Sequence, residues 1–440
     1  MNMPLFGTNG IRGIANEEIT PEFAVKIAKA IGSYFSGDIA IAMDTRISSE
    51  MLKNSVISGL VSVGCNVYDA NIAPTPALQY YLKNSDLDAG IIITASHNPP
   101  QYNGIKVVDS NGEELQREIE EKIENMFYAG NFKKVAWNEI GSIYTADIID
   151  FYIEGVLKST QAEETKLKVV IDCGNGAGCL AMPYLVASVA NVVTLNSEPK
   201  GLPSRNYEPV KENLDDLIRT VKAVNADLGI AYDGDADRAI FIAENGEYIS
   251  GDYSLAMIAG HKLEKKKGYI VTPVSTSKCV EEYVKMKGGK IFYTEVGARN
   301  VAKKMKEVNA IFGGEENGGL IFPEHQYCRD AGMASIYMIN MIAERGKRIS
   351  DILKNLPKYY TVKEKIECKD KEKVMGKIKE IVDENADFTD GIRINSDDGF
   401  ILIRPSGTEP LIRIYVERKS EEEAKRIAEE YKRMIKDLSK

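Results

Sequence analysis

Short apolar runs alternate with amphipathic stretches along the first third of the chain. The runs have the length and composition of buried strands, and they lie at residues 38–43, 66–69 and 89–94. The stretches between them repeat apolar residues every three or four positions, which predicts helices. We expect these helices to begin at Thr20-Pro21, near residue 50 and at Thr75-Pro76, with each threonine as an N-cap. Strands that alternate with helices indicate a right-handed, mostly parallel α/β unit.

The same alternation restarts twice and then changes. A second unit has predicted strands at 166–172 and 227–232, and a third has them at 269–272 and 290–294. Beyond residues 357–360, which we interpret as a hinge, strands follow one another across tight turns. They are predicted at 391–395, 400–404 and 411–417, before a final helix capped by Ser420. This order indicates an antiparallel α+β domain.

These patterns predict an α/β protein with three similar mixed α/β domains and a C-terminal α+β domain around a central cleft. The expected domains are residues 1–145, 146–245, 246–356 and 357–440. The length of 440 residues agrees with several domains, because it exceeds what one hydrophobic core usually fills.

Composition narrows the class of protein further. The net charge is −9, from 56 basic and 65 acidic side chains, whereas a nucleic-acid partner would require a basic surface. The longest apolar runs have strand length and the first residues lack a signal-peptide pattern, so no membrane partner is expected. Six cysteines without a Cys-Xaa-Xaa-Cys pair predict neither a zinc site nor a disulfide framework. A cytoplasmic protein fits best.

Ser96 follows the third apolar run and lies in Thr94–Pro100, whose polar residues and paired prolines end the strand. A rigid strand end is where α/β proteins place their chemistry. The alternative is a serine in an ordinary turn. Two other stretches, Asp233–Arg238 and Arg404–Pro410, favour the interpretation that Ser96 carries a phosphoryl group.

Asp233, Asp235 and Asp237 alternate with Gly and Ala. In extended chain this spacing places all three carboxylates on one side. Crowded carboxylates require a compensating cation, and Mg²⁺ with oxygen ligands answers that need. The alternative is an EF-hand calcium loop, but its sixth position would be Arg238 and not glycine. Arg238 fits phosphate better, since a guanidinium binds it through two hydrogen bonds.

Two further loops are suited to a phosphorylated sugar. Glu315 and Asn317 are spaced so that both could face one side and bind sugar hydroxyls. The turn between two predicted strands concentrates groups that can bind a phosphate dianion, namely Arg404, Ser406, Gly407 and Thr408. Each of these two loops could also be only a structural turn.

The loops at 94–100, 233–238, 313–319 and 404–410 together resemble the four signature loops of the α-D-phosphohexomutase family, in that family's order. The resemblance implies that Ser96 is phosphorylated and that a phosphate oxygen on it joins the three aspartates as a metal ligand. It places Arg238 near the phosphoryl group and gives Lys106 a role in proton transfer, with Arg12 as a further basic residue. The 404–410 loop would bind the phosphate that is not reacting.

The implied reaction moves phosphate between O1 and O6 of a hexose by way of a hexose 1,6-bisphosphate. Residues 6–13 resemble phosphoglucosamine mutases, whereas 94–103 and 313–319 also resemble phosphomannomutase/phosphoglucomutase relatives. Glucosamine phosphate is the expected substrate and mannose or glucose phosphate the alternative. A phosphoserine-based phosphatase and a non-catalytic sugar or calcium binder remain as other possibilities.

Two positions depart from the family's pattern. Asn317 stands where serine is frequent, and Gly319 stands where histidine is frequent. The missing histidine leaves a proposed acid/base group unassigned. We consider His325, six residues further on, as a replacement.

Overall fold

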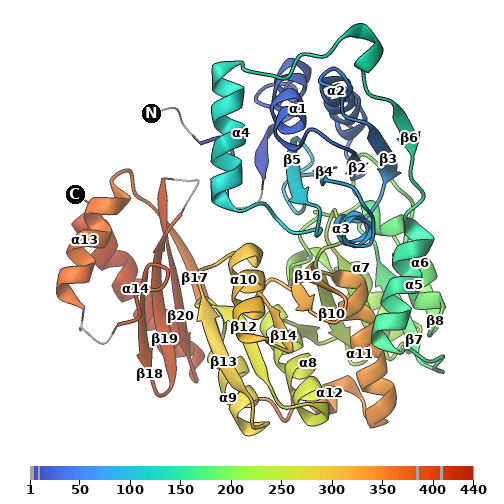
Figure 1. The fold of residues 1–440 in the computed structure, drawn as a ribbon. Coiled ribbons are helices and arrows are strands. Elements are labelled where there is room, and N and C mark those ends of the chain that lie inside the picture. Colours follow the sequence, from blue (N-terminus) through green and yellow to red (C-terminus); the bar gives the residue numbers. More distant parts are fainter. Residues whose placement is uncertain (1–3, 8–9, 383–385, 407–409, 440) are drawn as a thin grey trace. The chain divides into compact units, whose positions relative to one another are not determined.

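The computed structural model, drawn as a ribbon in Figure 1, describes residues 4–7, 10–382, 386–406 and 410–439. The chain forms two compact units. The first unit comprises Met1–Ser250 and Gly318–Asp351, and the second comprises Gly251–Asn317 and Ile352–Lys440. The segment predicted as the third domain therefore contributes to both units.

A six-stranded sheet in the order β1-β5-β4-β2-β3-β6 forms the first part of the first unit. Its strands are β1 (Ile11–Ile14), β2 (Ile39–Met43), β3 (Val67–Ile72), β4 (Ala89–Ile93), β5 (Tyr102–Asp109) and β6 (Ile143–Thr145). β4, β2, β3 and β6 run parallel, which confirms the three predicted strands. β5 is antiparallel to β4 and to β1, and neither β1 nor β5 was predicted, because both contain glycine and polar residues.

Apolar faces of the helices close the core of this sheet. The helices are α1 (Pro21–Phe35), α2 (Ser49–Val61), α3 (Thr75–Lys83) and α4 (Arg117–Ala129). α1 contacts both α2 and α4 (Figure 1). One buried cluster joins residues such as Ile27, Ile41 and Leu52. Thr20 caps α1 as predicted, since its side chain accepts from the backbone N–H of Phe23 at 3.2 Å.

The predicted cap at Thr75 is wrong. Pro74 precedes α3, and no side chain caps the helix. The Thr75 hydroxyl instead donates to Asp235 Oδ2 at 2.6 Å. Sequence could not distinguish the two roles, because a Thr-Pro helix start looks the same whichever way the hydroxyl points.

The second sheet of the first unit has the order β11-β10-β9-β7-β8. Its strands are β7 (Lys168–Asp172), β8 (Asn191–Leu195), β9 (Leu228–Tyr232), β10 (Ala239–Ala243) and β11 (Tyr248–Ile249). β8, β7 and β9 are parallel, whereas β10 is antiparallel to β9. The accompanying helices are α5 (Ile149–Thr160), η2 (Ala177–Leu180), α6 (Met182–Ala187), η3 (Lys211–Asn213) and α7 (Asp215–Ala223). The short helix η1 (Trp137–Glu139) instead precedes β6 of the first sheet.

A later segment of the chain returns to the first unit. It contains β15 (Leu320–Phe322), β16 (Gln326–Arg329) and α11 (Ala331–Arg345), and α12 (Ile349–Leu353) follows. β15 and β16 pair antiparallel, and α11 contacts α5, α6, β9 and β10. This return brings residues near 329 to the end of β9.

The second unit contains a parallel set of strands and an antiparallel sheet. The parallel strands are β12 (Tyr269–Pro273), β13 (Lys290–Thr294) and β14 (Phe312–Gly314), with the helices α8 (Gly251–Lys265), α9 (Lys278–Met286) and α10 (Ala298–Val308). The antiparallel sheet has the order β17-β20-β19-β18. Its elements are β17 (Tyr360–Glu367), α13 (Lys371–Ile381), β18 (Ile392–Ser396), β19 (Gly399–Pro405), β20 (Leu411–Arg418) and α14 (Glu421–Leu438).

The predicted α/β class with an antiparallel C-terminal domain is confirmed. Strand β17 was not predicted. Its many charged residues interrupt the alternation of apolar and polar positions that marks a strand, and its first residue was assigned to a hinge. Ser420 accepts from the backbone N–H of Glu423 and caps α14 as predicted. Across the described parts of the chain, no helix has both the length and the apolar character that crossing a membrane requires.

Candidate active site

Ser96, the predicted phosphate carrier, lies in the turn after β4 and is 1% exposed. Its hydroxyl donates to Asp233 Oδ2 at 2.8 Å, and its backbone N–H donates to Thr94 Oγ1 at 2.8 Å. The backbone φ of Ser96 is +50°, in the left-handed region that serine rarely adopts. Such a conformation costs on the order of 1–3 kcal/mol and persists only where the surroundings impose it. The fold therefore holds this hydroxyl toward Asp233.

The three aspartates converge in the loop between β9 and β10. One carboxylate oxygen of each lies within 4.8 Å of the other two, and all three residues are buried. The expected extended backbone is wrong, since residues 233–238 form a turn in which Ala236 has a φ of +54°. A Cβ on Gly234 would lie 2.5 Å from the carbonyl oxygen of Ser96, so glycine lets this loop approach the serine.

One oxygen of each aspartate accepts a hydrogen bond from a side chain. The donors to Asp233, Asp235 and Asp237 are, in that order, Ser96 at 2.8 Å, Thr75 at 2.6 Å and Arg329 at 2.6 Å. The Oδ1 atoms of Asp235 and Asp237 are buried and have no hydrogen-bond partner among the described residues. Buried carboxylate oxygens are normally satisfied, and a hard divalent cation takes such oxygens as ligands. The residues present therefore fit a divalent metal ion.

Sequence reasoning missed Thr75 and Arg329. Arg329 ends β16, is 4% exposed, and belongs to none of the motifs identified in the sequence. Its position beside the aspartates depends on the late return of the chain to the first unit. A residue brought to a site in this way leaves no local signal in the sequence.

The pKa values of the three carboxyl groups diverge. Burial raises the pKa of Asp233 well above its usual range, and Asp235 and Asp237 add to the effect. Burial and Asp237 likewise raise the pKa of Asp235. Burial alone would raise the pKa of Asp237 too, but the cations Arg329, Lys106 and Arg238 lower it. The positive charge near Asp233 and Asp235 thus does not offset the effect of their burial, and a bound cation would stabilise their charged forms.

The predicted basic residues surround this cluster. Lys106, on β5, is 5% exposed, and its Nζ lies 3.2 Å from Glu114 Oε1 and 3.9 Å from Asp237 Oδ2. Arg238 Nε lies 3.9 Å from Asp233 and 3.7 Å from Asp237. The structure therefore brings Ser96, the aspartates, Lys106 and Arg238 together.

Arg12, on β1, reaches the same region. Its Nη1 donates to Asn98 Oδ1 at 2.6 Å, so it contacts the loop that carries Ser96. Burial lowers the pKa of Arg12, and Asp235 only partly offsets this effect. Arg12 is thus a partly buried guanidinium at the edge of the cluster.

His97 also lies beside the serine, and its Nδ1 is 3.4 Å from Ser96 Oγ. Burial lowers the pKa of His97 to about 2, and the nearby Arg238 and Arg12 contribute to the shift. The imidazole is consequently neutral at physiological pH.

His325 has different surroundings from those expected of a replacement acid/base group. It is 1% exposed, its ring stacks on Tyr80 with centroids 4.2 Å apart, and its Nδ1 lies 2.9 Å from Ser159 Oγ. Its Nε2 is 3.5 Å from Asp330 Oδ2. Burial lowers its pKa. These contacts give His325 a packing role, and they give no support to the hypothesis that it replaces a histidine at Gly319.

The EF-hand alternative is wrong. The turn is followed directly by β10, and Glu244, which would be the last calcium ligand, accepts from the backbone N–H of Ser350 at 3.3 Å and from its hydroxyl. Among the described residues, the three aspartates form the only group of acidic, histidine or cysteine side chains that is arranged so that it could hold a metal ion.

The remaining predicted residues lie in the second unit. Glu315 is 3% exposed, and its Oε1 accepts from the backbone N–H of Gly297 at 3.1 Å. Arg404, on β19, donates from Nε to Asp390 Oδ2 at 2.7 Å. Ser406 is buried, and its N–H donates to the carbonyl oxygen of Leu411 at 2.9 Å. Asn317 lies in the turn after β14 and is partly exposed. Gly407 and Thr408 lie outside the described residues.

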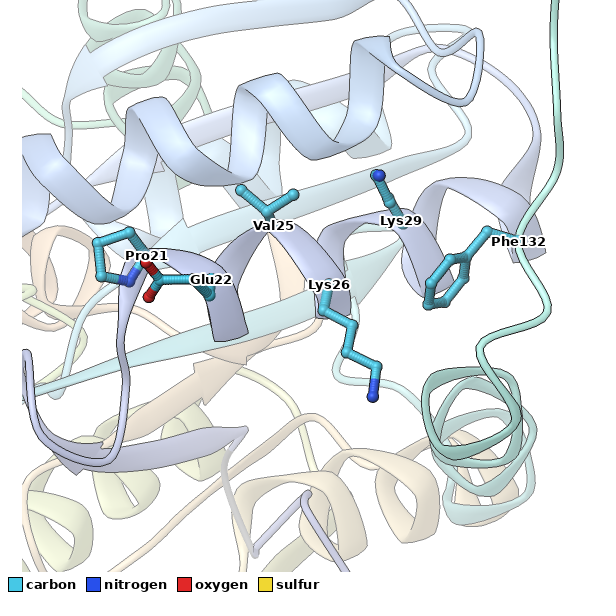
Figure 2. Close-up of a pocket in the computed structure, with 6 residues that line it drawn as sticks. All are labelled: Pro21, Glu22, Val25, Lys26, Lys29 and Phe132. Carbon is cyan, nitrogen blue, oxygen red and sulfur yellow. The ribbon is translucent and has the colours of Figure 1, made fainter.

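A separate pocket of about 370 Å³ lies beside α1, and Figure 2 shows its lining side chains. They are Pro21, Glu22, Val25, Lys26, Lys29 and Phe132. None of them belongs to the loops that hold Ser96 or the aspartates. We therefore place the candidate active site at Ser96 and not at this pocket.

Comparisons with known proteins show the family to which the chain belongs. Four family models match successive segments of the chain: phosphoglucomutase/phosphomannomutase domains I, II and III, described as alpha/beta/alpha, and the C-terminal domain of the same family. They match residues 3–134, 150–246, 250–360 and 364–434, respectively.

Similar proteins match over nearly the whole chain. A phosphoglucomutase/phosphomannomutase of Thermococcus kodakarensis is 45% identical over 97% of both chains, and a probable phosphoglucosamine mutase of Pyrococcus horikoshii is 43% identical over 99% of this chain and 98% of its own. A solved structure of a phosphoglucomutase/phosphomannomutase family protein from Burkholderia thailandensis is 27% identical, with a TM-score of 0.89 over 99% of this chain and 97% of that one.

The chain thus belongs to the phosphoglucomutase/phosphomannomutase family, and the predicted resemblance is confirmed. It is an isomerase of the phosphohexomutase class.

Replacing Asp235 by Asn should weaken binding of a divalent cation by about tenfold to a hundredfold, because losing a charged contact costs on the order of 1.5–3 kcal/mol. Titration with Mn²⁺, followed by electron paramagnetic resonance, measures this affinity without requiring turnover. Asp86→Asn, which removes an exposed carboxylate, is the matched control and should bind like the wild type. Equal affinity in Asp235→Asn and the wild type would contradict the assignment of the aspartates as metal ligands.

Proposed function

We propose that this protein interconverts hexose 1-phosphate and hexose 6-phosphate through a phosphoserine at residue 96. The observation that carries the proposal is the 2.8 Å hydrogen bond from the Ser96 hydroxyl to Asp233, within a buried cluster of carboxylates and cations. A serine in this position can carry a phosphoryl group beside the residues that would neutralise it. Catalysis then rests mainly on positioning and electrostatic stabilisation.

The reaction consists of two transfers. In the first, a sugar hydroxyl oxygen bonds to the phosphorus of phospho-Ser96, the bond from phosphorus to Ser96 Oγ breaks, and the hydroxyl loses its proton. The product is a hexose 1,6-bisphosphate, which turns around in the site. In the second, Ser96 Oγ takes the other phosphoryl group, and the oxygen left on the sugar regains a proton. Hexose 1,6-bisphosphate also primes an enzyme that has lost its phosphate.

The residues of the first unit take distinct roles in this scheme. Arg238 lies near the transferring phosphoryl group and offsets its charge, since a guanidinium binds phosphate oxygens in a bidentate manner. Lys106 moves the proton to or from the sugar hydroxyl, and its 3.9 Å distance from Asp237 places it at the cluster. Arg12, bonded to Asn98, adds positive charge beside the serine loop.

The three aspartates would hold Mg²⁺, with a phosphate oxygen on Ser96 as the further ligand. When bound, Mg²⁺ supplies charge stabilisation to the phosphoryl group. The two buried Oδ1 atoms of Asp235 and Asp237 support this proposal, because no donor in the described residues satisfies them.

The residues of the second unit would recognise the sugar phosphate. We propose that Glu315 and Asn317 bind sugar hydroxyls and that the phosphate not undergoing reaction is bound by Arg404, Ser406, Gly407 and Thr408. Arg404 is paired with Asp390, so binding a phosphate would require it to exchange or share that partner. The proposed domain boundaries remain 1–145, 146–245, 246–356 and 357–440.

Glucosamine phosphate is the proposed physiological substrate, with mannose and glucose phosphates as the alternative. The similarity to a probable phosphoglucosamine mutase and to a phosphoglucomutase/phosphomannomutase supports both choices, at 43% and 45% identity. Coupled assays on the three sugar phosphates decide between them. The highest kcat/KM should be found with glucosamine phosphate. A higher kcat/KM with mannose or glucose phosphate would make that sugar phosphate the substrate instead.

Ser96→Ala should abolish mutase activity and leave the fold intact, because the hydroxyl is the phosphate carrier and the loop can keep its other contacts. Steady-state assays measure the loss, and thermal unfolding checks the fold. Ser55→Ala, which removes a hydroxyl that bonds only within α2, is the control and should keep full activity. Retention of substantial activity by Ser96→Ala would falsify the covalent mechanism.

Arg404→Ala should raise KM for both the 1-phosphate and the 6-phosphate sugar by roughly tenfold to a hundredfold, since each loses one charge-assisted contact. Phosphorylation of Ser96, scored by intact-protein mass, should persist. Arg426→Ala removes an exposed arginine of α14 and should leave both KM values unchanged. A loss confined to one of the two substrates, or no loss, would mean that this loop is only a structural turn.

A further inference from the structure

Arg46 lies between β2 and α2, is 2% exposed, and has all five of its N–H donors engaged. Nε donates to Asp44 Oδ2 at 2.9 Å. The four remaining bonds go to backbone carbonyl oxygens: Nη1 donates to Pro99 at 2.7 Å and Tyr102 at 2.9 Å, and Nη2 donates to Ser96 and Asn98, both at 2.7 Å. The loop from Ser96 to Tyr102 is thus wrapped around one guanidinium group.

Asp44 extends this contact back to the serine. Its Oδ2 accepts from the Thr94 hydroxyl at 2.7 Å, and the Thr94 oxygen in turn accepts from the backbone N–H of Ser96 at 2.8 Å. Ser96 is therefore held on both sides, through its carbonyl by Arg46 and through its amide by Thr94. The ring of Tyr207 covers the guanidinium, with 4.6 Å from Cζ to the ring centroid.

This network stabilises a loop conformation that is otherwise unfavourable. Four carbonyl dipoles that converge on one point repel one another unless a donor stands between them, and Ser96 has a φ of +50°. The phosphorylated serine would add nearly two negative charges next to the buried aspartates. Repulsion between these charges would push the loop away from the cluster, and the hydrogen bonds of Arg46 would oppose that displacement.

We propose that Arg46, oriented by Asp44, is a positioning residue that sets Ser96 Oγ for phosphoryl transfer. The proposal rests on the proposed role of Ser96 as phosphate carrier. Arg46 bonds to the backbone of the loop and not to Ser96 Oγ, so it acts through geometry. Holding the loop requires the five N–H donors of a planar guanidinium group. The ammonium group of lysine has three donors on one atom and cannot make the same bonds.

The test compares Arg46→Gln, Arg46→Lys and the control Lys53→Gln. Lys53 is a buried cation of the same domain whose Nζ lies 2.9 Å from Asp69 and which does not bond to the serine loop. For each variant we would measure kcat, KM, the melting temperature and the phosphorylation of Ser96 by intact mass after incubation with a hexose 1,6-bisphosphate.

Arg46→Gln should lower kcat by about a hundredfold with little change in KM, because a displacement near 1 Å has an effect of that size. Arg46→Lys keeps the charge opposite Asp44, so it should recover part of the melting temperature but not of kcat. Lys53→Gln should lower the melting temperature and keep the wild-type kcat.

Wild-type kcat in Arg46→Lys would overturn the proposal, since charge alone would then be sufficient. The proposal would also be overturned if Arg46→Gln and Lys53→Gln lost kcat equally at equal melting temperatures. Arg46 would then only stabilise the fold in a general way. If Arg46→Gln does not fold, Arg46→Lys decides by the same criterion. Failure of the wild type to become phosphorylated would instead contradict the proposed function of Ser96.

Discussion

Three carboxylates buried within reach of one another are the constraint on which the first unit depends. Such a cluster is unfavourable unless hydrogen bonds and positive charges compensate it. Arg329, Lys106 and Arg238 compensate Asp237, whereas burial dominates at Asp233 and Asp235 and raises their pKa values. The negative charge of the cluster therefore exceeds the positive charge around it, and binding of a further cation would be favourable. In a phosphoryl-transfer centre, an excess of negative charge of this kind is what a bound divalent cation neutralises.

The fold satisfies the constraint by bringing distant parts of the chain to two strand ends. Ser96 follows β4 and the aspartates follow β9, while Thr75 comes from the start of α3 and Arg329 from the end of β16. The contact between the two loops is close enough to require glycine at position 234. Most of the participating side chains are buried, so their orientation is fixed by packing before any ligand binds.

The sequence predicted the parts of this arrangement that lie within one short segment. Ser96 and the aspartates carry their chemistry in local patterns, and the strands β2, β3 and β4 of the first sheet are apolar enough to be recognised. The partners that position them were not predictable. Thr75 belongs to a helix-start pattern that gives its hydroxyl another role, and Arg329 and Arg46 belong to no local pattern. All three reach the site only through tertiary structure. The antiparallel strands β1, β5 and β17 were also missed, since glycine and charged residues interrupt their alternation.

The central claim is that Ser96 passes its phosphoryl group to the sugar, and a label chase tests it most directly. Ser96 would be loaded from a hexose bisphosphate carrying radioactive phosphate, freed of excess label, and mixed with unlabelled glucosamine 6-phosphate and Mg²⁺ in a rapid-quench instrument. If Ser96 is the phosphate carrier, the label will leave the protein and appear in the sugar phosphates at least as fast as the enzyme turns over. Label that stays on the protein, or that is released as inorganic phosphate, would contradict this role of Ser96.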